Sequence, residues 1–279
     1  MPPLAAAAVR FAAAGAAMAA VAAVVDRRHG WPTGRQWLDY SLVGVLLLSV
    51  GNALVMWAER TVPSGIAALI VATVPVWLVL LDGLRRGGRR WTAPLWAGTL
   101  VGLAGVALVV QPRGTLGAGH WPAVLGLQTA CLSWAVGSLY AQSISPRLPF
   151  ATSAAVEMLV GALVLAIESR LFGEDIGRLL SASPRAYGAL AYLAVFGSLV
   201  GFNAFVYCLN ELPASTVGTY AYVNPVVAVV LGALVLGELL TTGLLAGGAL
   251  IVLAVVLTTL RPRAPRVAVD VQGREASPP

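Results

Sequence analysis

Charged residues are scarce in this chain. They make up 11% of its 279 positions, whereas a soluble domain of this length carries about 25%, and lysine is absent, so that all 18 basic residues are arginine. Hydrophobic residues reach 58% and the mean hydropathy is +0.83. This composition excludes an ordinary soluble domain and indicates a membrane protein.

Catalytic and nucleic-acid-binding signals are equally sparse. The two histidines, His29 and His120, stand singly in loops, and Cys131 and Cys208 lie inside apolar runs as small packing residues. No Cys, His or Asp cluster has metal-ligand spacing, and no Ser or Cys has a base nearby in the sequence. We therefore expect no cofactor, no metal and no membrane enzyme. Basic residues interleaved with aromatic residues are also missing, so nucleic acid is not an expected partner.

The apolar runs are about 17 to 23 residues long, which suits helices that cross a bilayer. We predict an all-α polytopic membrane protein with nine spans, and a disordered tail over 261–279, where Pro and Arg are frequent. The predicted spans are 4–25, 39–57, 64–82, 95–111, 122–142, 150–169, 187–208, 214–236 and 243–260.

Arginine counts in alternate loops predict the orientation. Loops after the odd-numbered spans hold twelve arginines, and loops after the even-numbered spans hold five. The first set therefore faces the cytoplasm, which makes the C-terminus cytoplasmic.

The sequence also contains an internal repeat. A shift of 150 residues aligns residues 50–113 with 200–263 at 18 identities in 64 positions, where about six would arise by chance in so biased a composition. A shift of 147 extends the match upstream, pairing 9–19 with 156–166. Equivalent spans are five apart, an odd number, so the two halves must cross the membrane in opposite senses. Inverted repeats are typical of secondary transporters, whose substrate site lies between the repeats.

The repeat divides the chain into a first unit of four spans, 1–113, and a second of five, 114–260. The partner of span 122–142 would lie before residue 1. We therefore expect a ten-helix plan that here lacks its first helix, through annotation or truncation.

Proline interrupts one span in each repeat, at the equivalent positions Pro75 and Pro225. Proline removes a backbone hydrogen bond and frees a carbonyl, which hydrocarbon tolerates only where protein or a watery cavity covers it. The pair predicts a cavity at these two helices, with a simple kink in each packed helix as the alternative.

Four segments resemble the EamA-like transporters of the drug/metabolite transporter superfamily, and the resemblance covers residues 2–260. The segments are VPSGIAALIVATVPVW (62–77), CLSWAVGSLYAQ (131–142), LPASTVGTYAYVNPVVAVVLGALVLGELL (212–240) and GGALIVLAVVL (247–257). The resemblance implies a ten-helix inverted-repeat fold with cytoplasmic termini that moves small metabolites, such as amino acids, across a bacterial inner membrane. In that family the first helix, missing here, helps to line the central cavity.

Two ionisable residues lie well inside spans at repeat-equivalent positions, Arg10 and Glu157. Such groups are functional candidates by default. They could bind a substrate carboxylate and ammonium, or pair with other groups and hold helices together. Glu157 is also the candidate for proton coupling.

Neutral polar side chains recur at helical spacing and predict a pocket of aromatic and hydrogen-bonding groups. Interhelical hydrogen bonding is the alternative, because it uses the same residue types. The cavity candidates are Asn52, Thr73, Pro75, Trp77, Trp134, Ser138, Asn203, Tyr207, Tyr220, Asn224 and Pro225, together with Arg10 and Glu157.

These observations favour a secondary transporter that exports amino acids or related metabolites by alternating access. Transport of nucleotide sugars or of drug-like or lipid-linked compounds, or a non-transporting scaffold, are the alternatives. The expected partners are a small-molecule substrate and the lipid bilayer, with proton coupling and a homodimer left open.

Overall fold

The computed structural model describes residues 1–29, 31–84, 93–110, 118–212, 217, 234 and 242–259, and every regular element within them is a helix. Within these residues, five helices are long and apolar enough to cross a membrane, judged by length and composition. They are Pro3–Val25, Gly34–Ala58, Trp121–Ser143, Phe150–Leu171 and Pro184–Glu211. The all-helical class expected from the sequence is therefore observed in the described part of the chain.

Most predicted spans coincide with single helices. These are α1 (Pro3–Val25), α6 (Ala93–Val110), α7 (Trp121–Ser143), α8 (Phe150–Leu171) and α14 (Thr242–Thr259). A short 3-10 turn, Ala118–His120, precedes α7, and α9 (Gly177–Leu180) lies in the long connection after α8. The predicted span 214–236, apart from residues 217 and 234, and the tail 261–279 lie outside the described residues.

Two spans contain a π-helical stretch. In the first, α2 (Gly34–Gly44) passes through Val45–Val50 into α3 (Gly51–Ala58). In the second, α10 (Pro184–Tyr192) passes through Leu193–Phe202 into α11 (Asn203–Glu211). π-helical turns are rare and often accompany functional sites.

The predicted span 64–82 is two short helices rather than one. α4 (Ser64–Val71) ends before Ala72, and α5 (Val74–Asp82) begins after Thr73. The break falls where Pro75 cannot donate a backbone hydrogen bond to the preceding turn.

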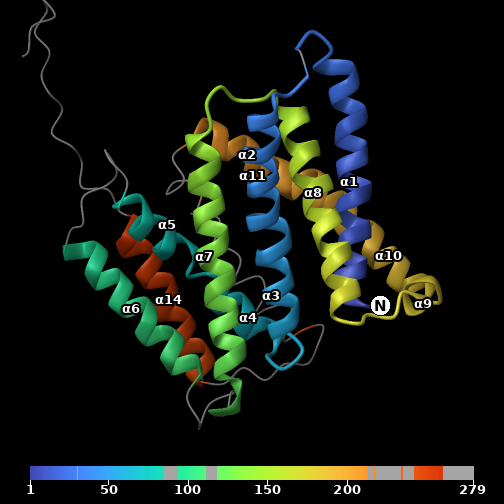
Figure 1. Ribbon diagram of the computed structural model, residues 1–279. Coiled ribbons are helices and arrows are strands. Elements are labelled where there is room, and N and C mark those ends of the chain that lie inside the picture. Colours follow the sequence, from blue (N-terminus) through green and yellow to red (C-terminus); the bar gives the residue numbers. More distant parts are fainter. Residues whose placement is uncertain are drawn as a thin grey trace, which may run out of the picture.

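Two antiparallel helix pairs stand at opposite ends of the bundle in Figure 1, α1 with α8 and α6 with α14, and α7 and α2–α3 lie between them. Small residues allow the close approach. A Cβ on Gly15 would meet the Leu159 side chain at 2.9 Å, and a Cβ on Gly105 would meet the Gly247 carbonyl at 2.8 Å. Close packing of small residues matters in a membrane because the hydrophobic effect contributes little to helix association there, so van der Waals contacts must hold the helices together.

Carboxylates join α1 and α8 at both ends. Glu174, just beyond α8, accepts hydrogen bonds from the backbone N–H groups of Leu4 (3.2 Å) and Ala5 (2.9 Å) in the first turn of α1. Asp26, at the end of α1, accepts from the backbone N–H of Thr152 (3.0 Å) in the first turn of α8. Each carboxylate satisfies backbone donors that a helix start leaves free.

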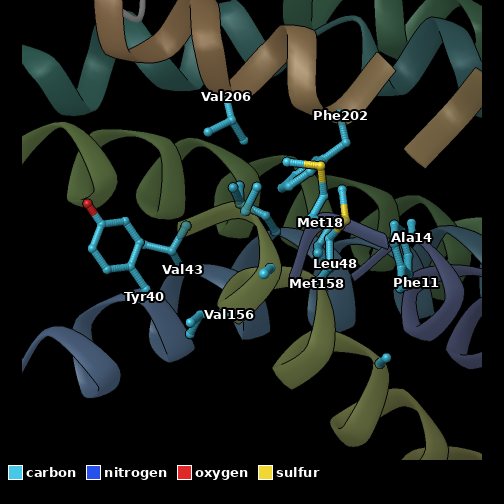
Figure 2. Packing of buried hydrophobic residues seen from close by; sticks show 14 of the residues in the cluster. Phe11, Ala14, Met18, Tyr40, Val43, Leu48, Val156, Met158, Phe202 and Val206 are labelled. Carbon is cyan, nitrogen blue, oxygen red and sulfur yellow. The ribbon is translucent and has the colours of Figure 1, made fainter. Parts of the chain in front are cut away.

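The largest apolar cluster lies between α1, α2, α8 and the helix through α11, and Figure 2 shows its packing. Phe11 and Met18 of α1 meet Met158 of α8 and Phe202 in this cluster. The cluster fixes the rotation of α1 and so determines where Arg10, the residue beside Phe11, can point.

Candidate substrate cavity

A cavity of about 860 Å³ lies among α1, the π-helical stretches, the α4–α5 break, α7 and α11. Its volume suits a small metabolite, because ligand sites usually measure about 300–1,000 Å³. Most of its wall is apolar. The polar or charged side chains that line it include Arg10, Asn52 and Trp134, and no acidic side chain among the described residues does so.

The helix break contributes its two flanks to the cavity. Val71, the last residue of α4, and Val74, the first residue of α5, both line the wall, whereas Pro75 is buried behind it. Pro75 leaves the Val71 carbonyl without the usual donor four residues later, and the Cys131 thiol lies 3.9 Å from that oxygen. Pro75 therefore affects the cavity indirectly, because it leaves the carbonyl of the lining residue Val71 without its usual helical hydrogen bond.

Gln128 of α7 binds the break itself and the helix that follows it. Its Oε1 accepts from the Trp77 indole N–H at 2.8 Å and lies 3.4 Å from the Thr73 hydroxyl. The Thr73 hydroxyl also donates to the Ile70 carbonyl at 2.8 Å. Thr73 and Trp77, predicted as cavity residues, thus stabilise the broken helix, and neither is among the described lining residues.

Each π-helical stretch ends near a glycine and an asparagine. Gly51 and Gly201 line the cavity, as does Asn52. The Asn52 amide donates to the carbonyls of Leu48 (3.0 Å) and Leu47 (3.2 Å), and the Asn203 amide donates to the Leu199 carbonyl (2.8 Å). These amides satisfy carbonyls in stretches where the helical hydrogen bonding is irregular.

Arg10 and Trp134 contribute a cation and a large aromatic ring to the wall. The Arg10 guanidinium lies 4.1 Å from the centre of the Phe11 ring, and the Trp134 ring lies 5.3 Å from that of Phe205. The Arg10 Nε and the Trp134 Nε1 are covered by protein and have no hydrogen-bond partner within the described part of the chain.

Other predicted residues lie away from this wall. Glu157 is 2% exposed and borders a separate pocket of about 10 Å³ with Tyr40 and Asn210. Ser138 is buried and donates to the Trp134 carbonyl at 2.7 Å.

Asn203 and Tyr207 also lie outside the described lining. Asn203 is buried, and its Oδ1 has no partner among the described residues. Tyr207 is 58% exposed and lies edge-on to Phe150. The predicted candidates Tyr220, Asn224 and Pro225 fall outside the residues that the structure describes.

Sequence reasoning missed several contributors. Phe11 and Phe205 line the cavity, and Gln128 connects the broken helix to α7. Gln128 carried a usable signal, because an amide in the middle of an apolar span needs a partner. The phenylalanines carried none, because lipid-facing and cavity-facing phenylalanines look alike in a sequence.

Membrane-length helices, an interrupted helix and a metabolite-sized cavity between the helices are the features of a polytopic membrane transporter. The EamA-like transporter family matches residues 1–111 and 121–260. The chain belongs to this family, within the drug/metabolite transporter superfamily, and is an integral membrane protein.

Three relatives illustrate the similarity. An uncharacterized inner membrane transporter, YedA, of Escherichia coli (strain K12) is 42% identical over 261 residues, which is 93% of this chain and 82% of YedA. The transporter YvbV of Bacillus subtilis (strain 168) is 26% identical over 96% of this chain and 86% of its own length. A probable terminal-alkyne amino-acid exporter of Streptantibioticus cattleyicolor is 28% identical over 97% of this chain and 86% of its own.

A solved crystal structure has the same fold. It superposes with a TM-score of 0.69 at 21% sequence identity, covering 93% of this chain and 89% of that one. At this identity the likeness concerns the fold alone.

Proposed function

We propose that this protein is a secondary transporter that exports amino acids or related small metabolites across the inner membrane of a bacterial cell. The single observation that carries the proposal is the cavity of about 860 Å³ with the cation Arg10 on its wall. An arginine inside a span is costly and is retained where it serves a pathway or a ligand. The inner-membrane location and the amino-acid cargo also agree with the names of YedA and of the alkyne amino-acid exporter.

Two repeats, 1–113 and 114–260, would rock against each other with opposite topology, in a nine-span chain whose C-terminus is cytoplasmic. The helix contacts support this arrangement. Residue numbers rise along α6 as they fall along α14, since Gly102 faces Ala254 and Gly105 faces Gly247. These helices are equivalent in the sequence repeat, as are α1 and α8, which also run antiparallel. Repeat-related helices that pack antiparallel are what a two-fold axis in the membrane plane produces.

The π-helical stretches give a second sign of the repeat. Adding the 150-residue shift to Val45–Val50 gives 195–200, inside the observed Leu193–Phe202. We assign Arg10, Asn52 and Trp134 to substrate binding, and Thr73, Pro75 and Trp77 to the shape of the broken helix. Glu157, away from the large cavity, is the proposed proton-coupling group, and Tyr220, Asn224 and Pro225 remain candidates for the cavity in the second repeat.

The described wall favours small metabolites over nucleotide sugars. Arg10 is the one basic side chain on it in the described part of the chain, whereas diphosphates are usually held by several charge-assisted hydrogen bonds.

Flux of amino acids in proteoliposomes tests the proposal. The wild-type protein should show saturable uptake or exchange, and Arg10→Gln should lower it at least about tenfold through the loss of a charge-assisted hydrogen bond. Arg28→Gln, on an exposed residue after α1, is the matched control and should leave flux unchanged. A scaffold protein would show no saturable flux with any metabolite, and this result would reject the transporter function.

A further inference from the structure

We infer that the cavity selects organic carboxylates with an apolar or aromatic body, and that a substrate ammonium group adds little to binding. This inference rests on the proposed transport function and names the chemistry of its cargo. Three observations carry it: the positive charge of Arg10 on the wall, the composition of the rest of the wall, and the position of Glu157.

Arg10 places a positive charge on the cavity wall, and no described carboxylate lines the cavity beside it. A cation inside a span costs free energy unless an opposite charge or a polar group compensates it. A carboxylate in the cavity supplies the opposite charge, so it offsets this cost.

The remaining wall suits an apolar body. Phe11, Phe202 and Phe205 line the cavity together with the ring of Trp134. Phe205 contacts both Trp134, at 5.3 Å between ring centres, and Phe202, at 6.4 Å. Aromatic rings in such offset or tilted arrangements favour another ring between or beside them. A purely polar cargo would lose its hydration here without replacement hydrogen bonds.

An ammonium group finds weaker partners. Glu157 borders its own small pocket with Tyr40 and Asn210, away from the large cavity, and no described carboxylate lines the cavity. Asn52 offers a neutral amide oxygen, while its N–H groups are already bonded to the carbonyls of Leu47 and Leu48. With Arg10 nearby, the potential inside the cavity opposes a second positive charge.

Four compounds with one phenylpropyl body separate the recognised groups. They are 3-phenylpropanoate (anion), 3-phenylpropanamide (neutral), 3-phenylpropylamine (cation) and L-phenylalanine (zwitterion). Isothermal titration of the full chain in nanodiscs measures each affinity. The anion should bind at least about tenfold more tightly than the amide, because charge-assisted hydrogen bonds are stronger than neutral ones. L-phenylalanine should bind no more tightly than the anion, since its ammonium meets no described carboxylate and is repelled by Arg10, and the amine should show no binding.

Variants link this order of affinities to the wall. Arg10→Gln should lower the affinity for 3-phenylpropanoate to that for 3-phenylpropanamide. Unchanged affinity of this variant for the amide would show that the cavity is intact. Arg28→Gln should match the wild type.

The inference is overturned if the amide equals the anion, if the amine binds, or if L-phenylalanine binds far more tightly than the anion. The wild-type protein alone decides these outcomes. Flux of another metabolite without binding of any of the four compounds also overturns the inference and leaves transport standing. Absence of both binding and flux rejects the proposed function itself.

Discussion

Asp26 and Thr152 lie 126 positions apart in the sequence and join the end of α1 to the start of α8. The Asp26 Oδ2 accepts from the Thr152 backbone N–H at 3.0 Å and from its hydroxyl at 2.8 Å. At the opposite end of the same pair, Glu174 accepts from the N–H groups of Leu4 and Ala5. α1 carries Arg10, so these two carboxylates help to set the depth of the arginine in the cavity.

Glu174→Gln should lower the free energy of unfolding by about 1–2 kcal/mol, because a neutral amide satisfies the α1 donors less well and does not interact with the helix dipole. The substitution also removes the ion pair with Arg60, at 3.7 Å. Asp175→Asn is the neighbouring control. Its side chain is 63% exposed, so its effect should stay within about 0.5 kcal/mol. Unfolding in mixed detergent micelles measures both, and equal effects would show that the Glu174 contact contributes nothing special.

Gly44→Ala should be strongly destabilising, by about 2 kcal/mol or more, because a Cβ there would overlap the backbone of Glu157 and force α2 away from α8. Gly34→Ala, in the same helix, is the matched control because a Cβ at Gly34 meets nothing within 4 Å. It should be neutral or slightly stabilising. Thermal unfolding of the two purified variants gives the comparison, and a tolerated Gly44→Ala would contradict the observed approach of the helices.

Trp77 of α5 and Gln128 of α7 should prove energetically coupled beside the helix break. Trp77→Phe removes the indole N–H that donates to Gln128 at 2.8 Å, and Gln128→Leu removes the acceptor. Each single change should cost about 1 kcal/mol, in the range measured for hydrogen bonds in membranes. The double variant should cost clearly less than the sum. A double-mutant cycle of unfolding free energies measures the coupling, and strict additivity would show that the two side chains act independently.

Glu157→Gln should abolish the response of flux to an imposed pH gradient while substrate exchange without a gradient continues. The reason is that a buried carboxyl, with one unpartnered oxygen in the described part of the chain, can take up and release a proton, and an amide cannot. Glu168→Gln is the matched control: Glu168 also has an unpartnered oxygen, but its other oxygen accepts from the Ser49 hydroxyl at 2.8 Å. Proteoliposome assays with and without the gradient distinguish the two carboxyls. A pH response that survives in Glu157→Gln would remove this residue from proton coupling.

Much of the fold could be predicted from the sequence because bilayer thickness fixes the length of a spanning helix. α7 and α8 differ from the predicted spans 122–142 and 150–169 by at most two residues at each end. The break near Pro75 was also predictable, since proline lacks the donor that a continuous helix needs. The π-helical stretches were not, because their sequences are ordinary apolar runs.

The candidate site was only partly predictable. Trp134 and Ser138 of α7 were both predicted cavity residues, yet Trp134 lines the cavity while the Ser138 hydroxyl donates to the Trp134 carbonyl of its own helix. Likewise Arg10 and Glu157 are equivalent in the repeat, but they border different pockets.

The sequence by itself determined that this chain is a membrane protein, where most of its described helices run, where one of them breaks, and to which family it belongs. Only the tertiary structure decided which face of each helix meets the cavity, which pairs of carboxylates and helix starts come together, and that Glu157 lies apart from Arg10. The physical reason is that side chains facing lipid are as apolar as those facing other helices. Apolar patterning therefore locates a span but does not fix its rotation, which depends on contacts such as Gly44 with Glu157 between residues far apart in the chain.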